Sequence, residues 1–109
     1  MTAANGLLRV AGGLTLINAA LHFFAFSVSG FNSWTMQFMV IGAVYGALGW
    51  GLTRGIGALA WVVFFISLCG MTAAQIAMSI TPIADWLLGM IALVELAAAG
   101  VLFVHLWRK

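Results

Sequence analysis

Charged residues are scarce in this sequence: only 6% of its 109 residues are Asp, Glu, Lys or Arg, whereas 65% are hydrophobic. A soluble domain has roughly a quarter of its residues charged, because its surface has to face water. A surface with so little charge suits hydrocarbon, and the sequence therefore predicts an integral membrane protein. The net charge of only +2, without a run of Lys or Arg, argues against binding to nucleic acid.

Groups that bind metals or carry out catalysis are also few. Cys69 is the only cysteine, which excludes an intramolecular disulfide and a zinc site made of several thiolates. The two histidines, His22 and His105, are predicted near opposite sides of the membrane, so they cannot jointly bind one haem. The sequence has no Ser/His/Asp arrangement and no phosphate-binding glycine loop. We therefore expect no metal, no cofactor and no enzymatic activity.

Long apolar runs, by contrast, fill almost the whole chain. A helix needs about 20 mostly apolar residues to cross the hydrocarbon of a bilayer. Four stretches meet this requirement: residues 7–27, 34–53, 56–80 and 83–107. Because the breaks between them are short, consecutive helices should be antiparallel neighbours. The sequence predicts an all-α protein with one domain, residues 1–109, in which four transmembrane helices form an up-down-up-down bundle.

The basic residues predict the orientation in the membrane. With the N-terminus inside, Arg9, Arg54, Arg108 and Lys109 all lie on the inner side, and Asp85 lies near the outer end of the last helix. This distribution follows the positive-inside rule. We therefore expect both termini in the cytoplasm and the chain in a plasma membrane of the bacterial inner-membrane type.

Small residues in the second predicted helix indicate where helices pack closely. Gly42, Gly46 and Gly49 share one stripe, and Gly42 and Gly46 have the GxxxG spacing that lets helix backbones approach in a membrane. The stripe can serve packing within the bundle or a dimer interface, and the motif alone does not distinguish them.

Polar side chains occur inside all four predicted helices. The set expected to form a buried polar cluster is Asn18, His22, Tyr45, Gln75 and Glu95. At about 1.5 Å of rise per residue, these groups lie in the outer half or the middle of the bundle. An ionisable side chain at that depth is costly, so it is a functional hypothesis by default.

Three interpretations of Glu95 stay open. It can be a protonated member of a polar core that donates a hydrogen bond to Asn18 or Tyr45 and sets the helix register. It can bind a proton or a cation during transport, with His22 as its partner. It can also pair with a group on another subunit.

Length, four short-looped helices and one buried glutamate make the chain similar in size and topology to the small multidrug resistance transporters. In that family the essential glutamate is in the first helix, whereas here the first helix has Asn18 and His22 and the glutamate is in the fourth. The resemblance therefore transfers no site.

Almost all features of the sequence concern helix packing and membrane anchoring. We therefore expect a small non-catalytic accessory or assembly subunit of a larger membrane protein complex, with membrane lipids as its surroundings. The alternative is a small homo-oligomeric, proton-coupled transporter that uses Glu95 as its coupling carboxylate. Four helices rarely enclose a path alone, so the alternative requires oligomerisation.

Overall fold

Four α-helices make up the computed structural model, which describes residues 3–108. They are α1 (Ala3–Ser29), α2 (Ser33–Thr53), α3 (Leu59–Ile80) and α4 (Asp85–Trp107). Each helix is long and apolar enough to cross a membrane, with Gly6–Ser29 as the membrane-length part of the first. The prediction of an all-helical chain with four candidate membrane spans is confirmed.

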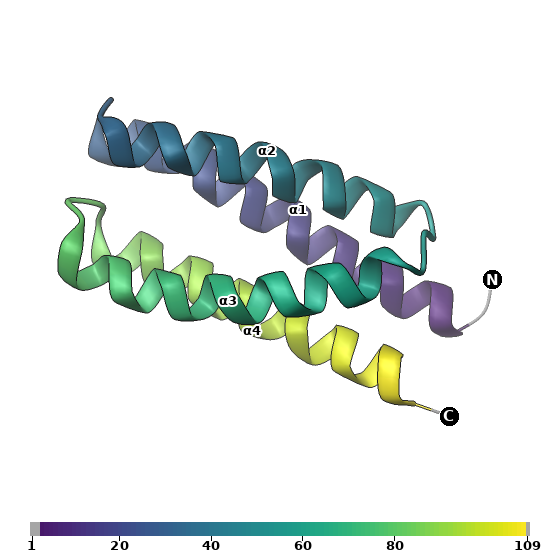
Figure 1. The fold of residues 1–109 in the computed structure, drawn as a ribbon. Helices are drawn as coiled ribbons and strands as arrows, with labels where there is room; N and C mark the ends of the chain where they lie inside the picture. Colours follow the sequence, from purple (N-terminus) through teal and green to yellow (C-terminus); the bar gives the residue numbers. More distant parts are fainter. Residues whose placement is uncertain (1–2, 109) are drawn as a thin grey trace.

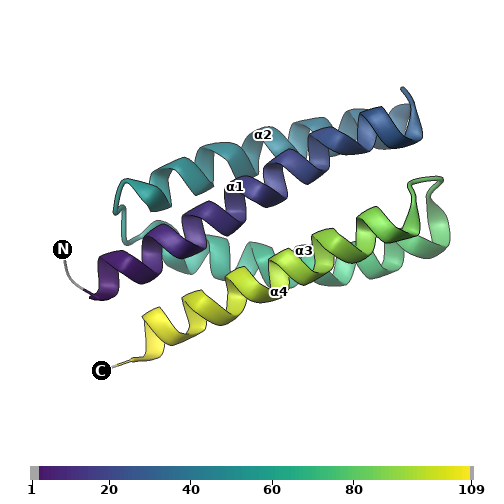
Figure 2. The same cartoon turned by 180° about the vertical axis from the view of Figure 1, so that it is seen from behind.

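The helices are arranged as two hairpins, α1–α2 and α3–α4, joined along α1 and α4 (Figure 1). The view from behind shows α1 and α4 side by side, with the first turn of α1 and the last turn of α4 at the same end (Figure 2). By contrast, α2 and α3 make few contacts with each other. The bundle is about 43 Å long, which matches a bilayer with its headgroup regions, roughly 40–45 Å thick.

Local chemistry explains where the first two helices meet. Gly30 follows α1 with a φ of 78°, a left-handed conformation that glycine adopts at little cost. Asn32 then caps α2: its Oδ1 accepts hydrogen bonds from the backbone N–H groups of Trp34 (2.9 Å) and Thr35 (3.0 Å). In return the Thr35 hydroxyl accepts from the Asn32 N–H, which completes a capping box.

The third and fourth helices begin later than the sequence predicts. Predicted starts at Ile56 and Ile83 become Leu59 and Asp85 in the structure. The turn after α2 contains Gly55, at a φ of 84°, and weak helix formers such as Gly57 extend it. Apolarity alone therefore overestimated both helices, because a loop at the membrane boundary can be as apolar as a helix.

Two apolar clusters occupy the two ends of the interior. One contains Leu52, Val63 and Leu102, and it lies at the end where the chain begins and finishes. The other contains Leu87 and Ile91 and lies at the opposite end. Polar residues fill the level between them, so the interior has an apolar–polar–apolar order along its long axis.

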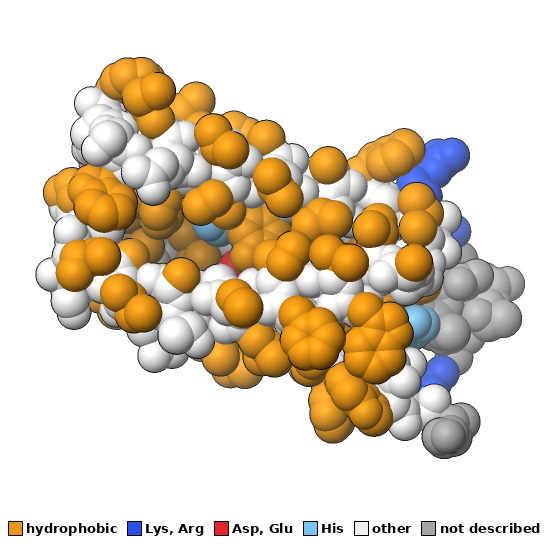
Figure 3. Space-filling view, viewed as in Figure 1, with side chains coloured by type: hydrophobic (Ala, Val, Ile, Leu, Met, Phe, Trp, Pro, Cys, Tyr) orange, Lys and Arg blue, Asp and Glu red, His pale blue; other side chains and the backbone are white. Residues whose placement is uncertain are grey.

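The outer surface is apolar around most of the bundle, and side chains such as Val40 and Leu93 are 67% exposed. In water such a surface would be a large exposed patch, whereas in lipid it is matched by its solvent. Figure 3 shows hydrophobic side chains over the visible face and Lys and Arg side chains at one end only. The structure is that of a chain with four helices able to lie in a membrane.

Candidate functional site

The middle level of the bundle has a hydrogen-bonded cluster centred on Glu95. Its Oε1 accepts a hydrogen bond from Asn18 Nδ2 at 2.9 Å and another from the Tyr45 hydroxyl. The three side chains come from α1, α2 and α4, and each is at most 3% exposed. Glu95 thus joins both hairpins through one oxygen atom, and we call Asn18, Tyr45, Glu95 and the adjoining His22 the polar cluster.

His22 adjoins this centre without touching the carboxylate. Its Nδ1–H donates to the backbone carbonyl of Asn18, 2.8 Å away, one turn earlier in α1. Its ring lies 5.2 Å from the Tyr45 ring and 5.1 Å from the Phe38 ring, between centroids. Among the described residues only Nδ1 is engaged, so Nε2 is the ring atom available to another group.

Two oxygen atoms of the cluster have no hydrogen-bond partner among the described residues. They are Glu95 Oε2 and Asn18 Oδ1, and both are buried. A buried polar atom without a partner costs free energy, about 1–3 kcal/mol, so it marks a place where a further donor would be stabilised. The structure brings Glu95 within hydrogen-bonding distance of Asn18 and Tyr45, the two partners expected from the sequence.

Gly70 on α3 makes room for the cluster. A methyl group at this position would overlap Glu95 Oε1 and lie 2.5 Å from the Tyr45 hydroxyl oxygen. At this position α3 therefore contributes space, because glycine has no side chain, rather than a polar group. The sequence contains no signal for this role, because it depends on which residue of α4 faces position 70.

A cleft open at the side of the bundle lies next to the cluster, between α2 and α3. This α2–α3 cleft has a volume of about 350 Å³, and its walls are Ile41, Tyr45, Phe65, Ile66, Cys69, Gly70 and Ala73. It adjoins a smaller inner cavity of about 90 Å³, which reaches His22 and Glu95. Figure 3 shows this hollow, with histidine and acidic side chains visible at its floor. A carboxylate in the middle of the bundle is therefore close to an opening at the side of the bundle.

Gln75 does not join the other predicted cluster residues. It is exposed on α3, whereas the buried face of that helix contains Ser67, Ala74 and Ala77. Consecutive helical positions differ by about 100° around the axis, so Gln75 points away from the face of Ala74. The sequence predicts Gln75 in the cluster because it does not reveal how α3 is rotated about its axis.

The three glycines of the predicted stripe on α2 lie in different surroundings. A methyl group on Gly42 would meet the Ala19 carbonyl oxygen at 3.1 Å, and one on Gly49 would meet the Gly12 carbonyl oxygen at 3.0 Å. At Gly46 the nearest atom is Ala19 Cβ at 3.9 Å, an ordinary contact distance. The close approach of α2 to α1 thus occurs at positions 42 and 49, seven residues apart. Of the GxxxG pair, Gly42 and Gly46, only Gly42 takes part in it.

Metal-binding groups are not gathered anywhere in the described part of the chain. Residues 3–108 contain no cluster of three His, Cys, Asp or Glu side chains that could hold an ion. Comparisons with protein-family models, curated proteins and solved structures give no match. The chain is therefore characterised by its own geometry: four helices able to span a membrane, and a polar cluster beneath a lateral cleft.

Proposed function

We propose that this protein is a non-catalytic accessory or assembly subunit of a larger membrane complex and that a partner's transmembrane helix packs into the α2–α3 cleft. It would span a bacterial-type plasma membrane up-down-up-down, with both termini in the cytoplasm. The observation that carries the proposal is the unequal packing of the four helices. α2 and α3 scarcely touch, so one side of the bundle is open where the other sides are closed.

The walls of the cleft suit a helix. On the α3 side, Gly70 and Ala73 have little or no side chain to project into the cleft. Small residues of this kind allow the close backbone approach that stabilises helix pairs in membranes. The α3 wall runs from Phe65 to Ala73, which is about 12 Å of helix, or about two turns. Such a length accommodates a few side chains of a neighbouring helix.

The polar floor supports a protein partner over a lipid chain. Glu95 Oε2 has no partner among the described residues, and an acyl chain offers no hydrogen-bond donor to it. A Ser, Thr, Asn or Lys side chain from a neighbouring helix could donate to this oxygen. Interhelical hydrogen bonds of this kind hold helices together in the bilayer.

Purification from membranes at native expression level tests this proposal. The protein, carrying a C-terminal tag, should co-purify in mild detergent with larger membrane proteins. Native mass spectrometry should show these proteins in a fixed ratio to it. A photo-crosslinker attached to Cys69, which is exposed in the wall of the cleft, should capture the same partner. Capture from an arbitrary position would show proximity only, so the position of the thiol matters.

A matched variant provides the control. In the double variant Cys69→Ser/Leu93→Cys, the only thiol moves to a residue that is 67% exposed on the outer side of α4. It should not capture that partner. A monodisperse homodimer without stoichiometric partners, or equal capture from both positions, would contradict the subunit proposal.

Glu95 supports the second candidate, a homo-oligomeric proton-coupled transporter. Glu95 Oε2, which has no partner within the described part of the chain, lies next to a cavity that adjoins the α2–α3 cleft. This oxygen could bind a cation or a proton, as the coupling carboxylates of transporters do.

Measuring transport by the Glu95→Gln variant tests this second candidate. In proteoliposomes the wild type should move its substrate with a proton gradient, and Glu95→Gln should abolish coupled uptake while its melting temperature stays close to that of the wild type. Retention of coupled uptake by a folded Glu95→Gln protein would exclude Glu95 as the coupling group.

A further inference from the structure

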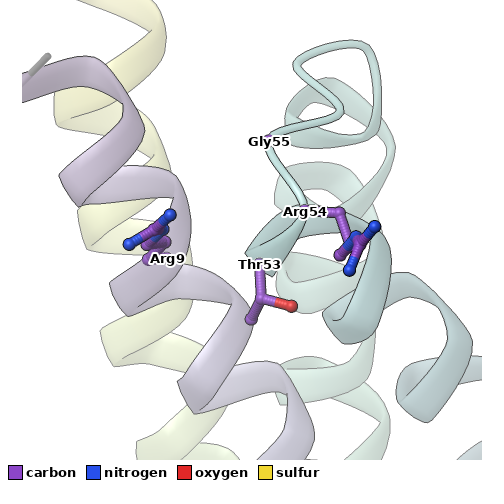
Figure 4. Close-up of a pocket in the computed structure, with 4 residues that line it drawn as sticks. All are labelled: Arg9, Thr53, Arg54 and Gly55. Atoms are coloured by element: carbon purple, nitrogen blue, oxygen red, sulfur yellow. The ribbon is translucent and has the colours of Figure 1, made fainter. Parts of the chain in front are cut away.

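A second hollow lies at the end of the bundle where the Lys and Arg residues gather. It has a volume of about 400 Å³ and is lined by Arg9 of α1 together with Thr53, Arg54 and Gly55 at the end of α2. Figure 4 shows Thr53 between the two arginines; Arg9 lies on α1, and Arg54 follows the last residue of α2. None of these residues belongs to the polar cluster or to the α2–α3 cleft.

We propose that this hollow binds a phosphate or phosphodiester anion, supplied in the membrane by the headgroup of an anionic lipid. The inference is independent of the proposed function, since it uses other residues and another level of the bundle. We call Arg9, Thr53, Arg54 and Gly55 the arginine pocket.

The charges of the arginine pocket are unbalanced. Both arginines are exposed. The two acidic residues of the chain are elsewhere: Asp85 begins α4 at the opposite end, and Glu95 is buried in the middle. Neither acidic side chain lies at this end of the bundle, so an anion from outside the chain can supply the counter-charge.

Arginine is suited to a phosphate by its shape as well as its charge. Each guanidinium presents a planar set of N–H donors that can bind two phosphate oxygens at once. The other polar groups of the pocket are already engaged: the Thr53 hydroxyl donates to the Trp50 carbonyl at 2.6 Å, and the Gly55 N–H donates to the Leu52 carbonyl at 3.0 Å. Binding must accordingly come from Arg9 and Arg54.

The location of the pocket favours a lipid as the source of the phosphate. It lies at the ends of membrane-length helices, and the Arg54 guanidinium carbon stands 5.4 Å from the centre of the Trp50 ring. Tryptophan rings favour the headgroup level of a bilayer, so this contact holds Arg54 where lipid phosphates are. Basic pockets between helices on the cytoplasmic side are a known way of binding anionic headgroups.

Lipid titration of the full-length protein in detergent, followed by native mass spectrometry, tests the inference. Phosphatidylglycerol should bind more tightly than zwitterionic phosphatidylcholine. Arg9→Gln and Arg54→Gln should each weaken phosphatidylglycerol binding roughly tenfold, because each removes a charged hydrogen-bonding group. Arg108→Gln removes a positive charge at the same end but outside the pocket, so it should change binding little.

Two further arms identify the anion and protect against misfolding. Arg9→Lys and Arg54→Lys keep the charge that sets membrane orientation but lose the planar fork, and they should bind with an intermediate affinity. Inorganic phosphate is tested by melting temperature in lipid-free detergent. A rise that the Gln variants abolish supports the site with a free anion as its ligand; no rise, with lipid binding kept, supports the headgroup.

Two results would overturn the arginine pocket. One is an equal loss of phosphatidylglycerol binding in Arg108→Gln, which would show only a general attraction to positive charge. The other is equal binding of the two lipids by the wild type together with no effect of inorganic phosphate.

Discussion

Replacing Gly12 by alanine should lower the melting temperature of the protein in detergent, whereas the same change at the neighbouring Gly13 should not. A methyl group on Gly12 would lie 2.8 Å from the Gly49 carbonyl oxygen and 2.8 Å from the Thr53 backbone nitrogen. These atoms belong to the backbone of α2, so the two helices would have to separate. Overpacking of this kind costs about 1–3 kcal/mol.

Gly13 is a close control because it is next to Gly12 in the same helix. A methyl group there meets nothing within 4 Å. Both changes gain the same helix propensity, about 1 kcal/mol, so the difference between the variants reports the contact alone. Thermal unfolding followed by circular dichroism measures it, and equal melting temperatures for the two variants would contradict the close approach of α1 and α2.

A second pair on α2 tests the same contact from the other side. Gly49→Ala should destabilise as Gly12→Ala does, because its methyl group would lie 3.0 Å from the Gly12 carbonyl oxygen. Gly46→Ala meets only Ala19 Cβ, at 3.9 Å, and should be tolerated. If Gly46→Ala instead dissolved an oligomer, the GxxxG pair would be a dimer face.

The limits of the sequence are visible in these glycines. Helical periodicity shows that Gly42, Gly46 and Gly49 share a stripe. It does not show which helix packs against the stripe or where the axis of that helix runs. In the structure the backbone of α1 approaches two of the three closely, and Gly12 is the counterpart of Gly49. The pairing of Gly12 with Gly49 is tertiary information, since the two residues lie on different helices.

The sequence predicts the level along the bundle at which the polar side chains lie, but not the rotation of α3 about its axis. Counting residues placed Asn18, Tyr45 and Glu95 at similar levels of three helices, and the structure brings these side chains into hydrogen-bonding contact. Gln75 lies on the exposed side of α3 instead. An apolar helix in lipid has no polar face to reveal its rotation, so a lone polar residue is a weak guide to the buried side.

Replacing Glu95 by leucine should destabilise the protein by about 1–3 kcal/mol, whereas Glu95→Gln should leave its stability near that of the wild type. Leucine removes the acceptor of two buried donors, Asn18 Nδ2 and the Tyr45 hydroxyl, whose side chains are at most 3% exposed. Glutamine keeps an oxygen for them, and its amide N–H could donate to Asn18 Oδ1, which lacks a partner among the described residues. Unfolding in mixed micelles with increasing SDS gives the free energies.

Tyr45→Phe completes a double-mutant cycle that assigns this effect to the hydrogen bond rather than to the shape of the side chain. The single change should cost about 1 kcal/mol in the wild type and much less in Glu95→Leu, because the acceptor has already been removed there. Equal costs in the two backgrounds would show that Tyr45 and Glu95 are not coupled. A stable Glu95→Gln protein also separates structure from chemistry. It keeps an acceptor for Asn18 and Tyr45 but lacks the acid, so a loss of proton-coupled transport by this folded variant would assign the coupling to the acid itself.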